Sequence, residues 1–179
     1  MSPAPITTAT SRIVPVLGFK GGTGRTTAVV HLAAALARQG RRVAVLDTTV
    51  HGDTTEWVED ARTTLPAGAT LPFELLESTG RAVPATSAQI VLVDTDGTTS
   101  AHARLRPILQ ASSLALIPAQ PSPLDVNSLW ATLDELELAH PHLPVLALVT
   151  MAHPAATLYR QMREVLVDEN VPALASSIP

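Results

Sequence analysis

The apolar positions of the 179-residue chain alternate between short continuous runs and longer stretches with helical spacing. A short run that is apolar at every position is typical of a strand buried on both faces of a sheet. Such runs predict strands at Ile13–Leu17, Val43–Asp47, Ile90–Asp94, Leu114–Ile117 and Val145–Val149, and a final strand at Ala173–Ile178. Helical spacing predicts helices over Thr26–Gln39, Thr54–Arg62, Leu105–Gln110 and Leu124–Ala139, and another around Leu158–Leu166. The segment Leu65–Arg81, which is interrupted by prolines and glycines, predicts no definite element.

This alternation predicts an α/β fold, a doubly wound and mostly parallel sheet with helices on both faces. In such a sheet, ligands bind at the carboxyl ends of the strands. Two of the predicted strands end in a carboxylate, at Asp47 and Asp94. Each aspartate taken alone is equally well explained as a turn residue or a helix cap. Because both lie at the same sheet edge as a glycine-rich turn, the pattern favours a functional site there.

Composition narrows the class of protein. With 46% hydrophobic and 16% charged residues, we expect one folded domain over residues 12–179 after a loose tail over residues 1–11, with no signal peptide and no membrane span. The absence of cysteine excludes disulfides and thiolate-bound metal clusters and fits a cytoplasmic protein. A net charge of -4 means that any binding of DNA requires a local basic patch.

The glycine-rich turn runs from Gly18 to Thr27, between the first predicted strand and the first predicted helix. Glycines at these positions let backbone N–H groups reach an anion, and the following helix adds its dipole, so the pattern predicts a phosphate-binding loop. The predicted nucleotide-binding residues are Gly21, Gly22, Thr23, Gly24, Arg25, Thr26 and Thr27. The Thr26 hydroxyl and Asp94 are the predicted ligands of Mg²⁺, with Asp94 acting through water. Arg25 stands where such loops usually have lysine.

Several motifs together resemble the ParA/MinD family of partition and positioning ATPases. Lys20–Thr27 is similar to the family's deviant Walker A loop, and Val43–Asp53 to its second motif. Ile90–Gly97 resembles the Walker B strand, and Leu114–Val126 is close to small plasmid-type ParA proteins. The resemblance runs from about Ile13 to the end of the chain.

The resemblance implies a P-loop NTPase fold of the deviant Walker A type that binds ATP or ADP with Mg²⁺. It implies a homodimer on ATP binding, a centromere-binding partner protein, non-specific DNA binding and therefore association with the nucleoid. It also implies catalytic roles for Lys20, which would reach across the dimer, and for Asp47. Members of the family continue beyond the position matching Ile178, so by this comparison the chain is short at its C-terminus.

Two departures from the family pattern, at Arg25 and Thr49, bear on ATP hydrolysis, and Val50 and His51 also differ from the family's second motif. The planar guanidinium of Arg25 is larger than the compact ammonium of lysine and prefers forked contacts to phosphate oxygens. Thr49 replaces an aspartate that helps to position the attacking water, and a hydroxyl is a poor base at neutral pH. The sequence therefore predicts a ParA-like protein that binds ATP with impaired or absent hydrolysis. The alternative is a fully active ATPase that drives DNA segregation. Membrane-associated positioning is disfavoured because Ala173–Pro179 carries no charge.

Overall fold

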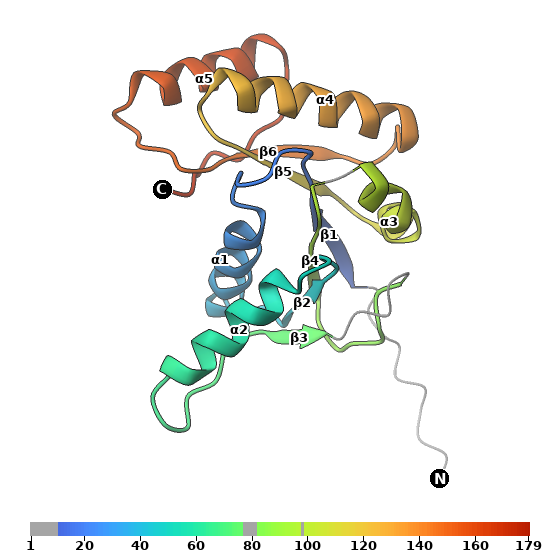
Figure 1. Ribbon diagram of the computed structural model, residues 1–179, viewed down its shortest axis with the longest axis vertical. Coiled ribbons are helices and arrows are strands. Elements are labelled where there is room, and N and C mark those ends of the chain that lie inside the picture. The colour runs from blue at the N-terminus through green and yellow to red at the C-terminus, as the bar shows by residue number, and fades with distance from the viewer. Residues whose placement is uncertain (1–10, 77–81, 98) are drawn as a thin grey trace.

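The computed structural model describes residues 11–76, 82–97 and 99–179 (Figure 1). The strands are β1 (Arg12–Val16), β2 (Val43–Asp47), β3 (Glu74–Leu76), β4 (Ile90–Asp94), β5 (Ala115–Ala119) and β6 (Val145–Val149). The helices are α1 (Arg25–Arg38), α2 (Asp53–Thr64), α3 (Thr99–Ala111), α4 (Pro123–Ala139) and α5 (Thr157–Asp168).

The described strands form one six-stranded sheet in the order β3-β2-β4-β1-β5-β6, and all of their pairings are parallel. The predicted fold class is therefore confirmed. From β1 the chain continues to β2 and β3 at one edge, returns to place β4 between β2 and β1, and then adds β5 and β6 on the other side of β1. The loop after β1 thus lies where the strand order reverses, the usual ligand crevice of an open parallel sheet.

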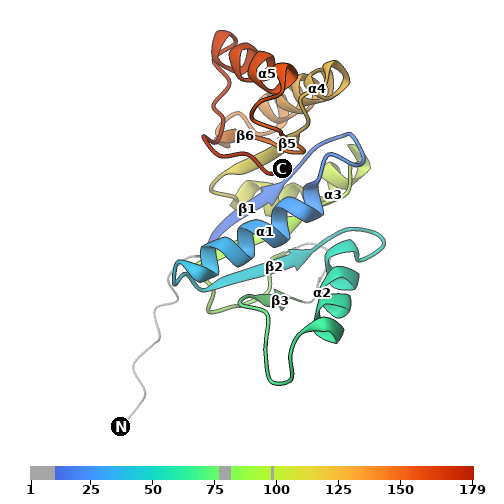
Figure 2. The ribbon, with the colours of Figure 1, turned by 90° about the vertical axis from the view of Figure 1, so that its left-hand side faces the viewer.

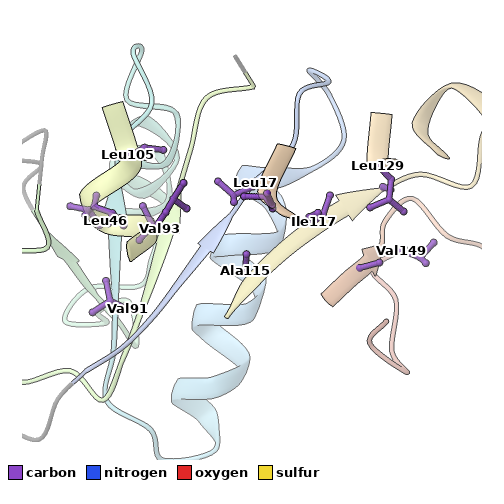
Figure 3. Packing of buried hydrophobic residues seen from close by; sticks show 14 of the residues in the cluster. Leu17, Leu46, Val91, Val93, Leu105, Ala115, Ile117, Leu129 and Val149 are labelled. Atoms are coloured by element: carbon purple, nitrogen blue, oxygen red, sulfur yellow. The ribbon is translucent and has the colours of Figure 1, made fainter. Parts of the chain in front are cut away.

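Helices cover both faces of the sheet. In Figure 2, α1 crosses in front of the central strands while α3 lies behind them. The α1 face is filled by Ala28, Val29 and Ala33 packed against strand residues such as Val45 and Leu92. On the opposite face of the sheet, residues of α3, α4 and α5 pack against the strands. Figure 3 shows this second layer, which includes Leu17, Leu46, Val93, Leu105, Ile117 and Leu129.

Helix boundaries follow local chemistry. The Ser122 hydroxyl accepts a hydrogen bond from the Asp125 N–H at 3.2 Å, and Pro123 occupies the first turn of α4, an arrangement that favours a helix start. Gly40 follows α1 with φ 80°, a left-handed backbone that glycine adopts without steric cost.

The sheet differs from the predicted strands in two places. β3 is a three-residue strand inside the segment for which no element was predicted, and residues 77–81 of that segment lie outside the described part. The predicted final strand at Ala173–Ile178 is wrong as a full strand, because only an isolated bridge joins Ala173 to Ala147. Leu174 and Ile178 instead pack into the α1 face, so this segment contributes to the core. Of the predicted N-terminal tail, residues 1–10 also lie outside the described residues.

Candidate functional site

The predicted phosphate loop connects β1 to α1 at the carboxyl edge of the sheet. Gly22 and Gly24 have φ values of 76° and 87°, so the loop requires left-handed backbone at both positions. Gly24 is the N-cap of α1, and no side chain caps the first turn of this helix. The first-turn amides and the positive end of the helix dipole therefore face the loop, as an anion site requires.

Residues from β5, β6 and their loops hold the phosphate loop in shape. The Thr150 hydroxyl donates to the Thr23 carbonyl at 2.6 Å, and the Gln120 amide donates to the Gly22 carbonyl at 2.6 Å. Thr23 and Thr150 are both buried. Both bonds are accepted by carbonyl groups of the loop, so neither of them uses a backbone N–H group that an anion would need.

Lys20 forms an ion pair with Asp125 of α4. Its Nζ lies 2.6 Å from Asp125 Oδ2, and the Ser122 hydroxyl also donates to this oxygen. The lysine side chain is 37% exposed, whereas the aspartate is 1% exposed. Within the described residues, Asp125 Oδ1 is buried and has no hydrogen-bond partner. Lys20 is thus held by an ion pair within its own chain.

Arg25 turns its guanidinium back into the loop. Nε donates to the Thr95 carbonyl at 2.9 Å, and Nη1 donates to the carbonyls of Lys20 at 2.6 Å and Gly18 at 3.1 Å. Burial lowers the pKa of Arg25, and the carboxylates of Asp94, Asp96 and Asp53 partly oppose this shift. An arginine stays protonated despite such a shift, so the loop contains a permanent positive charge.

Asp94 ends β4 and is fully buried. The hydroxyls of Thr26 and Thr54 both donate to its Oδ2, at 2.8 and 2.7 Å. Its Oδ1 is buried without a hydrogen-bond partner among the described residues. Burial raises the pKa of Asp94 to about 6, with a smaller raising effect from Asp47, against lowering contributions from the two threonine hydroxyls and Arg25. A buried carboxylate oxygen that lacks a donor and lies beside a loop hydroxyl fits a hard divalent cation that keeps most of its waters.

Asp47 ends β2, directly opposite Asp94 in the sheet register. Its Oδ1 accepts bonds from the Thr49 N–H at 3.0 Å and the Thr49 hydroxyl at 2.7 Å. Its Oδ2 accepts bonds from the Thr55 N–H at 2.8 Å and the Thr55 hydroxyl at 2.9 Å. The Thr49 hydroxyl in turn accepts the Asp53 N–H at 2.8 Å. Asp47 and Thr49 are therefore engaged in shaping the turn that starts α2.

The structure brings most of the predicted site residues together. The loop residues from Lys20 to Thr26 meet Asp94 through Thr26, and Asp47 lies one strand further along the same edge. Gly21, Gly22 and Thr27 are exposed, and the Thr27 carbonyl pairs with His31 Nδ1 at 2.8 Å. Sequence reasoning missed four residues that bond site residues: Thr54, Thr95, Gln120 and Asp125. It marked Thr150 as a possible contact to the nucleotide base, whereas here the Thr150 hydroxyl bonds the loop. For Asp125, the Ser-Pro-x-Asp pattern of a capped helix start was a local signal.

No helix in the described ranges has the length and apolar character needed to cross a membrane.

A family model described as VirC1 protein matches residues 11–174. Protein virC1 of Rhizobium rhizogenes is 33% identical over 127 residues, covering 68% of this chain and 54% of that protein. The maintenance of carboxysome distribution protein A of Gloeobacter kilaueensis is 40% identical over 126 residues, covering 68% of this chain and 55% of that protein. The chain thus spans about half the length of these curated relatives.

A solved structure from Borrelia burgdorferi, described as a plasmid partition protein bound to AMPPNP, superposes with a TM-score of 0.70. The match is 13% identical and covers 93% of this chain and 87% of that one. At this identity the likeness establishes a shared fold.

Proposed function

The chain belongs to the VirC1 family, whose fold and motifs here are of the ParA/MinD type, and we propose that it is a ParA-like nucleotide-binding protein of a DNA partition system. It binds ATP and ADP with Mg²⁺ in the loop after β1, and it hydrolyses ATP slowly or not at all. Residues 12–179 serve as one nucleotide-binding domain.

The observation that carries the proposal is the pairing of Thr26 with Asp94. The hydroxyl and the partly unsatisfied buried carboxylate lie side by side, at the end of a helix whose first turn has no side-chain cap. The loop amides from Gly21 to Thr27 would hold the phosphates, and Thr26 and Asp94 would hold Mg²⁺, Asp94 through water. When bound, the metal neutralises charge on the phosphate oxygens. The AMPPNP-bound relative of the same fold supports this use of the loop.

Weak hydrolysis follows from the two departures from the family pattern. The Nε and Nη1 groups of Arg25 donate hydrogen bonds to main-chain carbonyls. The Thr49 hydroxyl is bonded to Asp47 and to the Asp53 N–H, and it offers no carboxylate to orient water. Lys20 and Asp47 remain the proposed catalytic residues, with Lys20 acting after its release from Asp125.

In the cell we propose an ATP-dependent homodimer that works with a centromere-binding partner and non-specific DNA in the cytoplasm, at the nucleoid. The relatives that support a partition role include virC1 and a protein that maintains carboxysome distribution. A fully active ATPase is the second candidate, which the intact loop geometry and Lys20 favour.

Calorimetry with ATP and ADP, with and without Mg²⁺, tests the binding proposal. We expect binding that Mg²⁺ strengthens, and Asp94→Asn should remove the magnesium-dependent part of the affinity. Absence of any ATP binding would overturn the proposal. Turnover should then be measured alone, with DNA and with a cognate partner. Robust Mg²⁺-dependent hydrolysis that Lys20→Ala abolishes would favour the active ATPase instead.

A further inference from the structure

The Arg25 side chain connects two loops that are far apart in the sequence. Nη1 bonds the carbonyls of Gly18 and Lys20 in the phosphate loop, while Nε bonds the carbonyl of Thr95 in the loop between β4 and α3. Thr95 is itself buried and donates through its hydroxyl to the Val16 carbonyl at 2.7 Å. The guanidinium therefore bonds main-chain carbonyls of both loops, and each bond is charge-assisted.

Gly97 lies directly against this guanidinium. A Cβ at position 97 would be 2.9 Å from both Nη1 and Nη2 and 3.2 Å from Cζ, distances that real Cβ atoms rarely tolerate. The backbone of Gly97 is not left-handed, so its conformation is open to other residues. Space for the guanidinium, rather than backbone conformation, is what requires glycine here.

We propose that Arg25 is a clamp, a positioning residue that joins the phosphate loop to the β4–α3 loop, and that Gly97 is the residue whose small size admits it. A lysine at position 25 has one terminal nitrogen on a flexible stem and lacks the planar fork that spans the two loops. Arginine at this position is therefore matched to Gly97 and to the Thr95 carbonyl. Among the residues that the structure describes, none accepts a hydrogen bond from Nη2.

A double-mutant cycle on the full chain without nucleotide tests the clamp, so its result is independent of whether the protein binds ATP. Arg25→Lys, which installs the residue usual in such loops, should lower the unfolding temperature by about 4 °C because the bonds to Thr95 and Gly18 are lost. Gly97→Ala should lower it by a similar amount because the added methyl displaces the guanidinium. In the Arg25→Lys background, Gly97→Ala should add little, since the lysine end can move away.

Gly21→Ala is the matched control for folding, because a Cβ there meets no atom within 4 Å and the backbone is not left-handed. Its unfolding temperature should stay near that of the unmodified protein. If Gly97→Ala alone does not fold, recovery of folded protein by adding Arg25→Lys supports the clamp, and failure to recover overturns it. Additive effects, or an unchanged unfolding temperature in Arg25→Lys, also overturn it.

A second measurement observes the clamp directly. In ¹⁵N NMR spectra, the Arg25 Nε–H, assigned by its loss in Arg25→Lys, should exchange slowly with solvent because it is bonded to the Thr95 carbonyl. Gly97→Ala should speed this exchange. Rapid exchange in the unmodified protein would contradict the proposal.

Discussion

Two neighbouring strands, β2 and β4, end in the same residue type at the same level of the sheet, yet their carboxylates have opposite environments. Asp47 accepts four hydrogen bonds, two on each oxygen, from Thr49 and Thr55. Asp94 accepts two, both on Oδ2, and its Oδ1 has no partner within the described structure although it is buried. Both oxygens of Asp47 are thus hydrogen-bonded within its own loop, whereas one oxygen of Asp94 has no donor among the described residues.

The difference separates a structural aspartate from one that is available to a ligand. Four donors stabilise the charge of Asp47, so removing that charge should harm the fold. Burial of a carboxylate with too few donors destabilises its charge, which is why the pKa of Asp94 rises to about 6. Natural proteins retain few buried unsatisfied groups, and a ligand site is a common reason for one.

The largest effect is expected from Asp47→Asn. The amide nitrogen would face N–H and hydroxyl donors of Thr49 or Thr55, so we expect a loss of about 3 kcal/mol in the free energy of unfolding. Urea denaturation of the nucleotide-free protein measures it. We expect the fold to need the charge of Asp47 but not the charge of Asp94. An unchanged urea midpoint in Asp47→Asn would contradict this distinction.

An effect of similar size, about 3 kcal/mol, is expected in the pH dependence of stability contributed by Asp94. Its pKa is about 6 in the folded protein against 3.8 for the ordinary group, so the folded state binds the proton more tightly. The destabilising contribution of Asp94 is therefore present above pH 6 and is lost as the pH falls through 6 toward 4.

Asp94→Asn should be more stable than the unmodified protein at pH 7.5, and this advantage should shrink as the pH approaches 4. Denaturation of both proteins across this range gives the difference directly and cancels the other titrating groups. An advantage that does not depend on pH would show that Asp94 is not the group that titrates.

The smallest effect is expected from Thr54→Val, which removes a buried hydroxyl from Asp94 Oδ2 while keeping the side-chain shape. We expect a loss of about 1 kcal/mol at pH 7.5 and a further rise in the pKa of Asp94, since this hydrogen bond lowers it. Thr55→Val is the matched control, because Asp47 Oδ2 keeps the Thr55 N–H as a donor. If Thr55→Val shifts the pH profile and Thr54→Val does not, the two carboxylates have been assigned the wrong roles.

The sequence predicted that Asp47 and Asp94 would share an edge with the phosphate loop, because continuous apolar runs ending in aspartate imply parallel buried strands. It did not distinguish the two, since Thr49 and Thr55, which bond Asp47, and Thr54, which bonds Asp94, all follow β2 and look alike in the sequence. The pairing of Lys20 with Asp125 joins residues 105 positions apart, and only tertiary packing brings them together. β3 was missed because a three-residue strand between prolines and glycines has too few positions to show a period.

The outer strands of the sheet also bear on how the chain behaves in concentrated solution. An open edge strand offers unpaired N–H and C=O groups to any other chain and is a site of aggregation. At one edge, β3 is only three residues long. At the other, the segment after α5 uses the free side of β6: the Ala147 N–H bonds the Pro172 carbonyl, and the Val149 carbonyl accepts the Ile178 N–H. Because Leu174 and Ile178 also anchor this segment in the core, removing the last seven residues would expose β6 and promote intermolecular β-pairing, rather than merely shorten a surface loop.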